Sequence, residues 1–425
     1  MCDLNTLTLI IEGCVNYWIS LAINGTVRTD TITALVEGMA ALVVANGEQI
    51  SDYPALDAIY PVNCNIATPN LCPNDFEITD AIIDLLQEGG YTLNQIEAAA
   101  KIMGSTDADR IIMGIFECID ARLQLEETGF MYVANEGSNR VNVINTTSNT
   151  VITSIPVSDA IGIAFDSLHN RMYVTGSSGP ISVIDINTNM VIGSIPIASF
   201  TWEIAFDPVH DRMYVPNGNN VSVIDTNTNT IVSTISGFSG ANDLAFDPVH
   251  DRMYVPSGGS VRVIDTNTNT IVGSPIIIGS TSYGIAFDPV HNRMYVTNTF
   301  SNTVSVIDTN TNTIVSTISG GFNSPYGIAF DSAHDRMYVT NFNNIGGNSV
   351  SVIDTNTNTI IGSSIPVGNQ PRGIAFDPLH DRMYVANSGS APSVSIIDTN
   401  TNMVIGSSIP TPGSPYGIAF TSLPS

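Results

Sequence analysis

The stretch Ile204-Ala-Phe-Asp-Pro-Val-His-Asp-Arg-Met-Tyr-Val-Pro-Asn217, followed by Val221-Ser-Val-Ile-Asp-Thr-Asn-Thr-Asn-Thr-Ile-Val232, recurs with small changes from Met131 to the end of the chain. The Met of its Met-Tyr-Val triplet falls at positions 131, 172, 213, 253, 294, 337 and 383, so successive copies are 41, 41, 40, 41, 43 and 46 residues apart. A repeat period near forty restricts the chain to a few architectures.

Each copy contains four short strand signals separated by turn residues. In the third copy they cover residues 204–206, 212–215, 221–224 and 230–235. Their Ile, Val, Tyr and Phe residues occur at both odd and even strand positions, and so on both faces of the sheet. This is expected when neighbouring sheets cover both faces. No 3.6-residue periodicity of a helical solenoid is visible. Four strands per repeat predict the blade of a β-propeller.

The ends of the repeat region predict a closed ring. The Ile-Ala-Phe strand precedes the second to seventh Met-Tyr-Val triplets, is missing before the first, and reappears alone at Gly417-Ile-Ala-Phe420. We therefore expect an all-β seven-bladed β-propeller in which residues 417–420 form the innermost strand of the blade that contains Met131. Such closure removes the exposed edges at both ends of the domain.

Tyr-Val-Thr-Asn occurs at 295–298 and 338–341, and Tyr-Val-Ala-Asn at 132–135 and 384–387, ahead of stretches similar to Val-Ile-Asp-Thr. These residues resemble the YVTN family of β-propeller repeats, which is known from microbial surface-layer and secreted proteins. The resemblance begins at about residue 129 and implies a propeller fold and an extracellular or cell-surface location. Related propellers include electron-transfer dehydrogenase subunits, adhesive modules and surface scaffolds, so the resemblance leaves the activity open.

Composition divides the chain at about Gly129. Residues 1–128 contain all five cysteines and the only lysine, with 4 basic and 19 acidic residues, whereas residues 129–425 contain 9 basic and 20 acidic residues. With a net charge of −26 and no basic patch, the sequence argues against nucleic-acid binding and against attraction to anionic membranes. The apolar run 7–23 is interrupted by Glu12 and Asn16, so we expect neither membrane insertion nor a recognisable signal peptide.

Residues 1–128 are predicted to form a smaller, mainly α domain. Helix signals cover 30–45, 79–88, 93–103 and 108–125, and the last of these carries a broad apolar stripe. The segment 5–23 fits a buried helix or a strand.

The cysteines leave two alternatives open. Cys64 and Cys72 bracket a Pro- and Asn-rich loop and are either a disulfide or two free thiols. Cys14 and Cys118 lie in apolar stretches typical of a core, and Cys2 is the fifth cysteine, to which the sequence assigns neither role. No Cys or Cys/His spacing indicates a metal site, and no cofactor motif is present.

Six histidines, 169, 210, 250, 291, 334 and 380, all occupy the slot Phe-Asp-x-x-His-x-Arg-Met-Tyr. A catalytic histidine is needed once, whereas a slot filled in six blades serves a need that the blades share. We interpret these histidines as structural partners of the turn between the first and second strands. Asp207 and Arg212 are expected to pair in the same turn.

The segment Asp225-Thr-Asn-Thr-Asn-Thr230 recurs in most blades, with oxygen-bearing side chains two residues apart. Calcium loops share that spacing, but this segment lacks the glycine and the distant bidentate glutamate of an EF-hand. It also lies where a hairpin is needed between the third and fourth strands, so we interpret it as an Asx-type turn.

One face of the propeller carries the variable residues. In a propeller, the turns after strands one and three lie on one face, and the loops after strands two and four lie on the opposite face. In this sequence the turns of the first face are nearly the same in every repeat, whereas the loops of the second face vary. Trp202, Tyr283, Tyr326 and Tyr416 occupy one equivalent position just before the innermost strand, and Arg372 occupies it in the last repeat. Glu203 and Asp243 replace the glycine that follows. The varied face also carries Phe200, Phe238, Phe300, Phe322 and Phe342.

Two interpretations of this rim stay open. Its aromatic side chains either stack on sugar rings or grip a polypeptide, or they pack between blades. Likewise, Glu203 and Asp243 are either a cation site or solvated side chains. The candidate ligand-binding residues are seven residues of this rim: Trp202, Glu203, Asp243, Tyr283, Tyr326, Arg372 and Tyr416.

No Ser-His-Asp order, phosphate loop, haem motif or metal cluster supports an enzyme. The first functional hypothesis is a non-enzymatic surface or assembly protein, in which residues 1–128 mediate formation of a homo-oligomer or polymer such as a layer, filament or appendage. The second is a glycan- or protein-binding propeller module. A weaker third is the propeller subunit of a redox enzyme.

Overall fold

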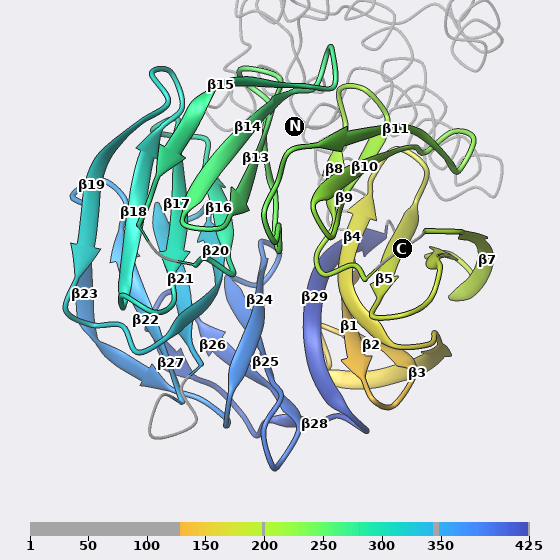
Figure 1. The fold of residues 1–425 in the computed structure, drawn as a ribbon. Coiled ribbons are helices and arrows are strands. Elements are labelled where there is room, and N and C mark those ends of the chain that lie inside the picture. Colours follow the sequence, from red (N-terminus) through yellow and green to blue (C-terminus); the bar gives the residue numbers. More distant parts are fainter. Residues whose placement is uncertain (1–127, 198–199, 280, 343–347, 424–425) are drawn as a thin grey trace, which may run out of the picture. The chain divides into compact units, whose positions relative to one another are not determined.

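The computed structural model describes residues 128–197, 200–279, 281–342 and 348–423, which form seven β-sheets arranged in a ring (Figure 1). The predicted seven-bladed propeller is confirmed, and the compact unit that contains it spans Glu127–Pro424. The predicted helices, the Cys64–Cys72 alternatives and the assembly role of residues 1–128 fall outside the described residues. Within the described ranges, no helix is long and apolar enough to cross a membrane.

Each blade is an antiparallel sheet whose strands follow one another from the ring centre outward. Blade 1 contains β29 (Ser414–Leu423), β1 (Thr128–Glu136), β2 (Arg140–Asn145) and β3 (Thr150–Pro156). Blade 2 contains β4 (Ala160–Asp166), β5 (Arg171–Gly176), β6 (Ile181–Asp185) and β7 (Met190–Ile195), and blade 3 contains β8 (Ala205–Asp207), β9 (Arg212–Asn217), β10 (Asn220–Asp225) and β11 (Thr230–Ser236).

The remaining blades repeat this order. Blade 4 contains β12 (Ala245–Asp247), β13 (Arg252–Ser257), β14 (Ser260–Asp265) and β15 (Thr270–Ile277), and blade 5 contains β16 (Ile285–Asp288), β17 (Arg293–Asn298), β18 (Thr303–Asp308) and β19 (Thr313–Ser319). Blade 6 contains β20 (Pro325–Asp331), β21 (Arg336–Asn341), β22 (Ser349–Asp354) and β23 (Thr359–Pro366). Blade 7 contains β24 (Pro371–Asp377), β25 (Arg382–Asn387), β26 (Ser393–Asp398), β27 (Met403–Val404) and β28 (Ile409–Pro410).

The hydrophobic core lies between the blades. On β9, Met213, Tyr214 and Val215 are fully buried. Met213 and Val215 pack against Tyr173 of blade 2, whereas Tyr214 faces the other way and packs against Met253 of blade 4. Both faces of the sheet are therefore covered, which explains why apolar residues occur at both odd and even positions of the strand.

The C-terminal strand closes the ring. β29 pairs antiparallel with β1, and Phe420 lies opposite Met131 while Ile418 lies opposite Val133. Residues 417–420 thus supply the innermost strand that blade 1 lacks in its own repeat. Because the first and last segments of the propeller share one sheet, opening that sheet exposes two unpaired strands at once.

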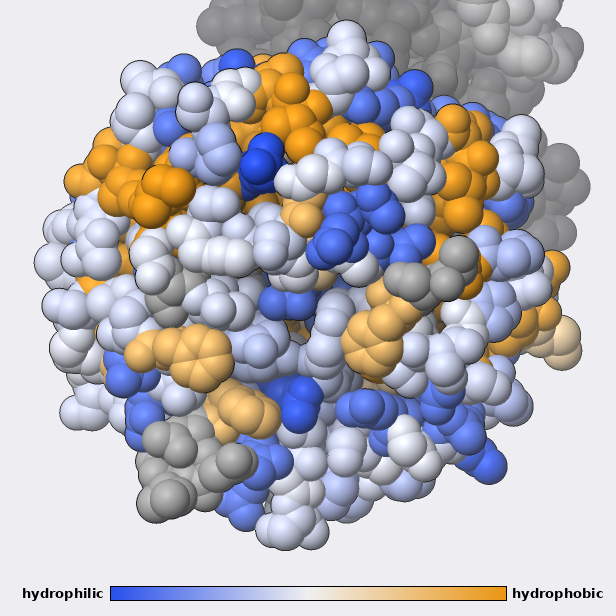
Figure 2. Space-filling model, in the orientation of Figure 1, coloured by the Kyte–Doolittle hydropathy of each residue, from blue (hydrophilic) through white to orange (hydrophobic). Residues whose placement is uncertain are grey.

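The outermost strands expose apolar side chains. The most exposed are Met190 on β7, Ile277 on β15 and Met403 on β27, with 65%, 68% and 61% of their surface accessible. Figure 2 shows such residues gathered toward the outer edge of the face in view. We call the exposed residues of the outer strands the outer girdle: Val151, Ile152, Met190, Val191, Ile192, Ile231, Val232, Ile277, Ile314, Val315, Met403 and Val404.

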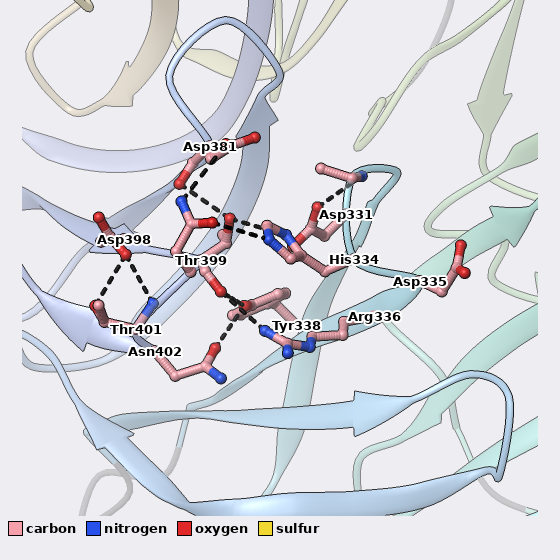
Figure 3. Close-up of polar contacts among 12 residues, drawn as sticks. Asp331, His334, Asp335, Arg336, Tyr338, Asp381, Asp398, Thr399, Thr401 and Asn402 are labelled. Atoms are coloured by element: carbon pink, nitrogen blue, oxygen red, sulfur yellow. Dashed lines mark hydrogen bonds and ion pairs between the residues drawn. The ribbon is translucent and has the colours of Figure 1, made fainter.

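On one face of the ring, the repeated turns join each blade to the next. In Figure 3, His334 of blade 6 contacts Asp331 through Nδ1 at 2.9 Å and Asn400 of blade 7 through Nε2 at 3.1 Å. Arg336 donates to the carbonyl oxygen of Thr399 at 2.8 Å, and the Tyr338 hydroxyl donates to Asn402. The histidines therefore belong to a repeated hydrogen-bond network between blades.

The expected pairing of Asp207 with Arg212 was wrong. The Asp207 carboxylate contacts His210 Nδ1 at 2.9 Å and accepts from the backbone N–H of Val209. Arg212 reaches instead to the carbonyl oxygen of Thr266 in the next blade at 2.6 Å. In the part of the chain that the structure describes, every salt bridge is a His–Asp contact of this turn. Sequence proximity suggested a local pair, but the arginine satisfies a carbonyl of the neighbouring blade.

The Asp-Thr-Asn turns have the geometry of Asx turns. Asp225 Oδ1 accepts from the Thr228 N–H at 2.8 Å and from the Thr228 hydroxyl at 3.0 Å. Asn229 closes the turn in the left-handed region, with φ of 54°, which asparagine tolerates better than most residues. No group of three or more metal-ligating side chains occurs in the described ranges. The repetition of oxygen-bearing side chains thus has an explanation in turn geometry.

Candidate ligand-binding mouth of the propeller

Seven equivalent positions meet at the centre of the varied face, one from each blade. In three blades the residue precedes the innermost strand, and in the other four it lies near the start of that strand. We call these residues the mouth ring: Ile161, Trp202, Asn242, Tyr283, Tyr326, Arg372 and Tyr416. Five of them were singled out from the sequence as candidate ligand-binding residues, and Ile161 and Asn242 complete the set.

The aromatic members of the mouth ring pack on one another. Tyr283 stacks on Tyr326 with ring centroids 4.9 Å apart, and Trp202 lies 5.7 Å from Tyr416. The hydroxyls of Tyr326 and Tyr416 are hydrogen-bonded. Tyr416 and Tyr326 are only 2% and 8% exposed. The rings therefore form an aromatic cluster at the centre of the ring, and Trp202 and Tyr283 are its more accessible members.

Arg372 lies against this cluster. Its guanidinium carbon is 4.4 Å from the ring centroid of Tyr416 and 4.8 Å from that of Phe342, distances at which a cation is attracted to an aromatic face. Its Nε donates to the Ser388 hydroxyl at 2.9 Å. The charge of Arg372 is thus directed toward aromatic faces and a hydroxyl.

Glu203 and Asp243 occupy positions where other blades have glycine for a steric reason. A Cβ at Gly162 would lie 2.2 Å from the Trp202 carbonyl oxygen, and one at Gly284 would lie 2.1 Å from that of Tyr326. The innermost strands of blades 3 and 4 are the shortest, since β8 and β12 have three residues, against four in β16 and seven in β4. The two acids therefore come with a local change of backbone in adjacent blades.

Threonines in the Tyr-Val-Thr segments explain part of this change. Thr297 accepts from the Gly284 N–H at 2.9 Å and donates to the Tyr326 carbonyl oxygen at 2.9 Å, so one hydroxyl joins two blades at the mouth. The equivalent residues of blades 3 and 4 are Pro216 and Pro256, which have no hydroxyl. Because Pro coincides with Glu203 and Asp243 in both blades, this substitution is a signal in the sequence that marks the altered backbone.

The two carboxylates lie in an environment that disfavours their charge. Asp243 Oδ1 accepts from the Leu244 N–H at 2.7 Å and Oδ2 from the Ile285 N–H at 3.0 Å. Burial still outweighs these bonds and raises the pKa of Asp243 to about 7. Burial and the nearby charge of Asp243 raise the pKa of Glu203 well above its usual range. Two acidic side chains of adjacent blades therefore lie close enough at the mouth for Asp243 to affect the charge of Glu203.

The other predicted aromatic residues have different surroundings. Phe238 and Phe322 are buried in the cores between blades, so the packing interpretation holds for them. Phe342 joins the aromatic cluster. Phe200 packs edge-on against Trp202 with centroids 4.8 Å apart and is 41% exposed, while Phe300 is 75% exposed. The sequence could not separate these roles, because all five lie in loops of the same face.

Comparison with known proteins shows the fold alone. No protein-family model matches the sequence, so the YVTN resemblance stays a prediction, and no curated protein matches it either. Among solved structures, Kuenenia stuttgartiensis hydrazine synthase is similar with 18% identity and a TM-score of 0.56, covering 66% of this chain and 92% of that one.

Two further structures share the fold. A functionally unknown protein from Desulfotomaculum acetoxidans has 17% identity and a TM-score of 0.60, covering 68% of this chain and 98% of its own. The dihydro-heme d1 dehydrogenase NirN has 12% identity and a TM-score of 0.53, covering 68% of this chain and 74% of its own. At these identities the activities of the matched proteins do not transfer.

Proposed function

We propose that this protein is a non-enzymatic binding protein whose propeller recognises a polypeptide at the mouth ring. The observation that carries the proposal is the difference between the two faces. On the turn face, most of the repeated His, Arg and Tyr side chains bond to the next blade, as His334 does to Asn400. On the varied face, the repeat is broken by Glu203, Asp243 and Arg372 beside an aromatic cluster.

A polypeptide fits the mouth better than a glycan does. Stacking on a sugar needs an open aromatic face, but the faces of Tyr326 and Tyr416 are covered by other rings and by Arg372. The exposed Phe200, which packs against Trp202, suits an apolar side chain of a peptide, as does the exposed Phe300 of the same face. Rigid aromatic groups with a few charges are also the groups enriched at the energetic centres of protein interfaces.

The proposal is tested with random-peptide and glycan libraries. Wild-type protein should select peptides, and replacing Phe200 and Trp202 together by alanine should lower their affinity at least about tenfold. A matched control replaces Val209 and Val249, exposed apolar residues of the turn face, by alanine and should leave affinity unchanged. Selection of glycans alone, or equal loss in the control, would contradict the proposal.

The redox alternative gains little from the residues at the mouth. Two of the similar structures are named as hydrazine synthase and a dihydro-heme d1 dehydrogenase, but all six histidines of this chain occupy the turn slot. In five of the six, a ring nitrogen of the histidine contacts a side chain of the next blade, as Nε2 of His250 contacts Asn310. The mouth therefore offers aromatic, carboxylate and guanidinium groups, which suit binding.

Self-association is a second candidate, and the outer girdle favours it. Every blade leaves an outer strand edge unpaired within the described ranges, and most of these strands expose Ile, Val or Met. Apolar residues beside free strand edges are surfaces that partners commonly cover. Together with the YVTN resemblance, this supports a surface or assembly role outside the cell, in which residues 1–128 contribute to a homo-oligomer or polymer.

A further inference from the structure

Within the residues that the structure describes, the acidic sector of the mouth has no cationic partner from the protein itself. We define this sector as Glu203 and Asp243, which belong to adjacent blades 3 and 4. Among the described residues, no arginine lies within salt-bridge distance of either carboxylate. Arg372, the cation of the mouth ring, is held over the faces of Tyr416 and Phe342 and by Ser388.

The surroundings of the acidic sector favour an organic cation. Trp202 directly precedes Glu203 in blade 3, and Tyr283 is the mouth-ring residue of blade 5, which follows blade 4; both side chains are partly exposed. Aromatic faces beside carboxylates attract an ammonium or guanidinium group, because the ring quadrupole adds to the Coulomb attraction. Glu203 follows Trp202 in the chain, and Trp202 packs with the aromatic cluster, so the acidic sector adjoins that cluster.

A metal ion fits the same residues less well. Calcium takes about six to eight oxygen ligands, whereas the acidic sector has two carboxylates, and the described residues contain no cluster of three. Both oxygens of Asp243 already accept backbone N–H groups, from Leu244 and Ile285. Those bonds fix the carboxylate in one orientation and leave few lone pairs for a metal.

We propose that Glu203 and Asp243 bind the ammonium or guanidinium group of a lysine or arginine side chain, presented by a polypeptide that docks beside Trp202 and Tyr283. This inference rests on the proposed function and names the residue type that the mouth selects. A basic side chain supplies the missing positive charge without requiring any other group of the protein to move. It also suits a chain with 39 acidic and 13 basic residues, because a basic partner is attracted over a longer range.

The test compares fluorescent peptides that differ at one residue. Peptides with a central lysine or arginine should bind the full chain, and otherwise identical norleucine and glutamate peptides should bind at least about tenfold more weakly. Free butylammonium, measured as a competitor, separates recognition of the bare cation from recognition of the peptide. All measurements are made at about pH 8, above the pKa of about 7 to which burial raises Asp243.

Variants tie the result to the acidic sector. Replacing both acids by glycine, the residue at the equivalent positions of the other five blades, should remove the preference for basic peptides while the protein stays folded. Glu136→Gln, on the same face but outside the mouth ring, is the control and should keep it. Equal binding of lysine and norleucine peptides, or an unchanged preference in the double glycine variant, would overturn the inference.

These outcomes separate the inference from the proposed function. If norleucine peptides bind and the Phe200, Trp202 double alanine variant loses them, the peptide-binding function stands and the choice of a basic residue fails. If calcium competes with the peptides or replaces them, the acidic sector is a metal site and the inference also fails. If no peptide binds at all, the proposed function fails with it.

Discussion

The hydroxyl of Tyr338 in blade 6 donates a hydrogen bond to Asn402 Oδ1 in blade 7, at 2.5 Å. The same Tyr–Asn contact recurs around the ring, as in Tyr132 with Asn189 and Tyr214 with Asn269. Burial raises the pKa of Tyr338 to about 12, so its hydroxyl stays protonated and able to donate at neutral pH. The Tyr of each Tyr-Val segment therefore links its own blade to the next one through its hydroxyl group.

We expect Tyr338→Phe to lower the free energy of unfolding by about 1–3 kcal/mol, because the Asn402 side chain loses a buried donor. Denaturant unfolding measures this. A double-mutant cycle with Asn402→Gly, which preserves the left-handed turn, should give a coupling energy of about 1 kcal/mol. Additive effects of the two substitutions would contradict the contact.

The C-terminal strand should be required for stability. A chain ending at Thr411 lacks β29 and leaves Met131 and Val133 without the partners Phe420 and Ile418. Burial of a large apolar side chain contributes about 1.5–3 kcal/mol when complete, against a typical total stability of about 5–15 kcal/mol. Scanning calorimetry of the full chain and of the chain ending at Thr411 measures the difference in their melting temperatures. A shortened chain that melts like the full one would show that closure by β29 is dispensable.

His250→Ala should reduce stability and leave peptide binding intact. His250 contacts Asp247 Oδ2 at 2.8 Å and Asn310 of the next blade at 3.2 Å, and removing it leaves the fully buried Asp247 with fewer partners. We expect a loss of about 1–3 kcal/mol, as for other buried hydrogen-bonded groups. Selective loss of a binding or catalytic activity with unchanged melting would refute the structural role.

Asp243 should make stability decrease as pH rises from about 4 to 7. Its folded pKa of about 7 lies above the unfolded value, so the folded state binds more protons in that window and unfolding becomes easier as they are released. Asp243→Asn cannot ionise, so its stability relative to wild type should rise by about 1–3 kcal/mol between pH 4 and pH 8. A pH-independent loss is added, because asparagine has one side-chain oxygen for the two backbone N–H groups that Asp243 accepts. Urea unfolding of both proteins across this range measures the difference. Parallel stability curves would contradict the shift.

Self-association should depend on both residues 1–128 and the outer girdle. Because the net charge of −26 opposes assembly, salt should promote it by screening. Sedimentation of the full chain at low and high salt, beside a chain starting at Glu127, tests the first part. Replacing Met190 and Ile192, which are 65% and 52% exposed, by serine tests the second. Monomers under all conditions would remove the assembly candidate.

The sequence by itself determined the propeller, because the evidence for it is local and repeated. Strand signals such as Val221–Ile224 and turns such as Asp225–Asn229 depend on backbone preferences and on contacts a few residues away. The solitary strand at 417–420 pointed to closure by the C-terminus because it completes the count of blades. Repetition also identified the histidines as structural without showing their partners.

Only the tertiary structure decided which groups meet across blades. Arg212 and Thr266 are 54 residues apart, so no local pattern could favour that contact over the nearby Asp207. The mouth aromatics likewise share one sequence position, but their packing depends on the geometry of ring closure. Tyr326 and Tyr416, 90 residues apart, cover each other while Trp202 stays partly exposed. Burial at the junction of two blades raises the pKa of both carboxylates, and the charge of Asp243 raises that of Glu203 further.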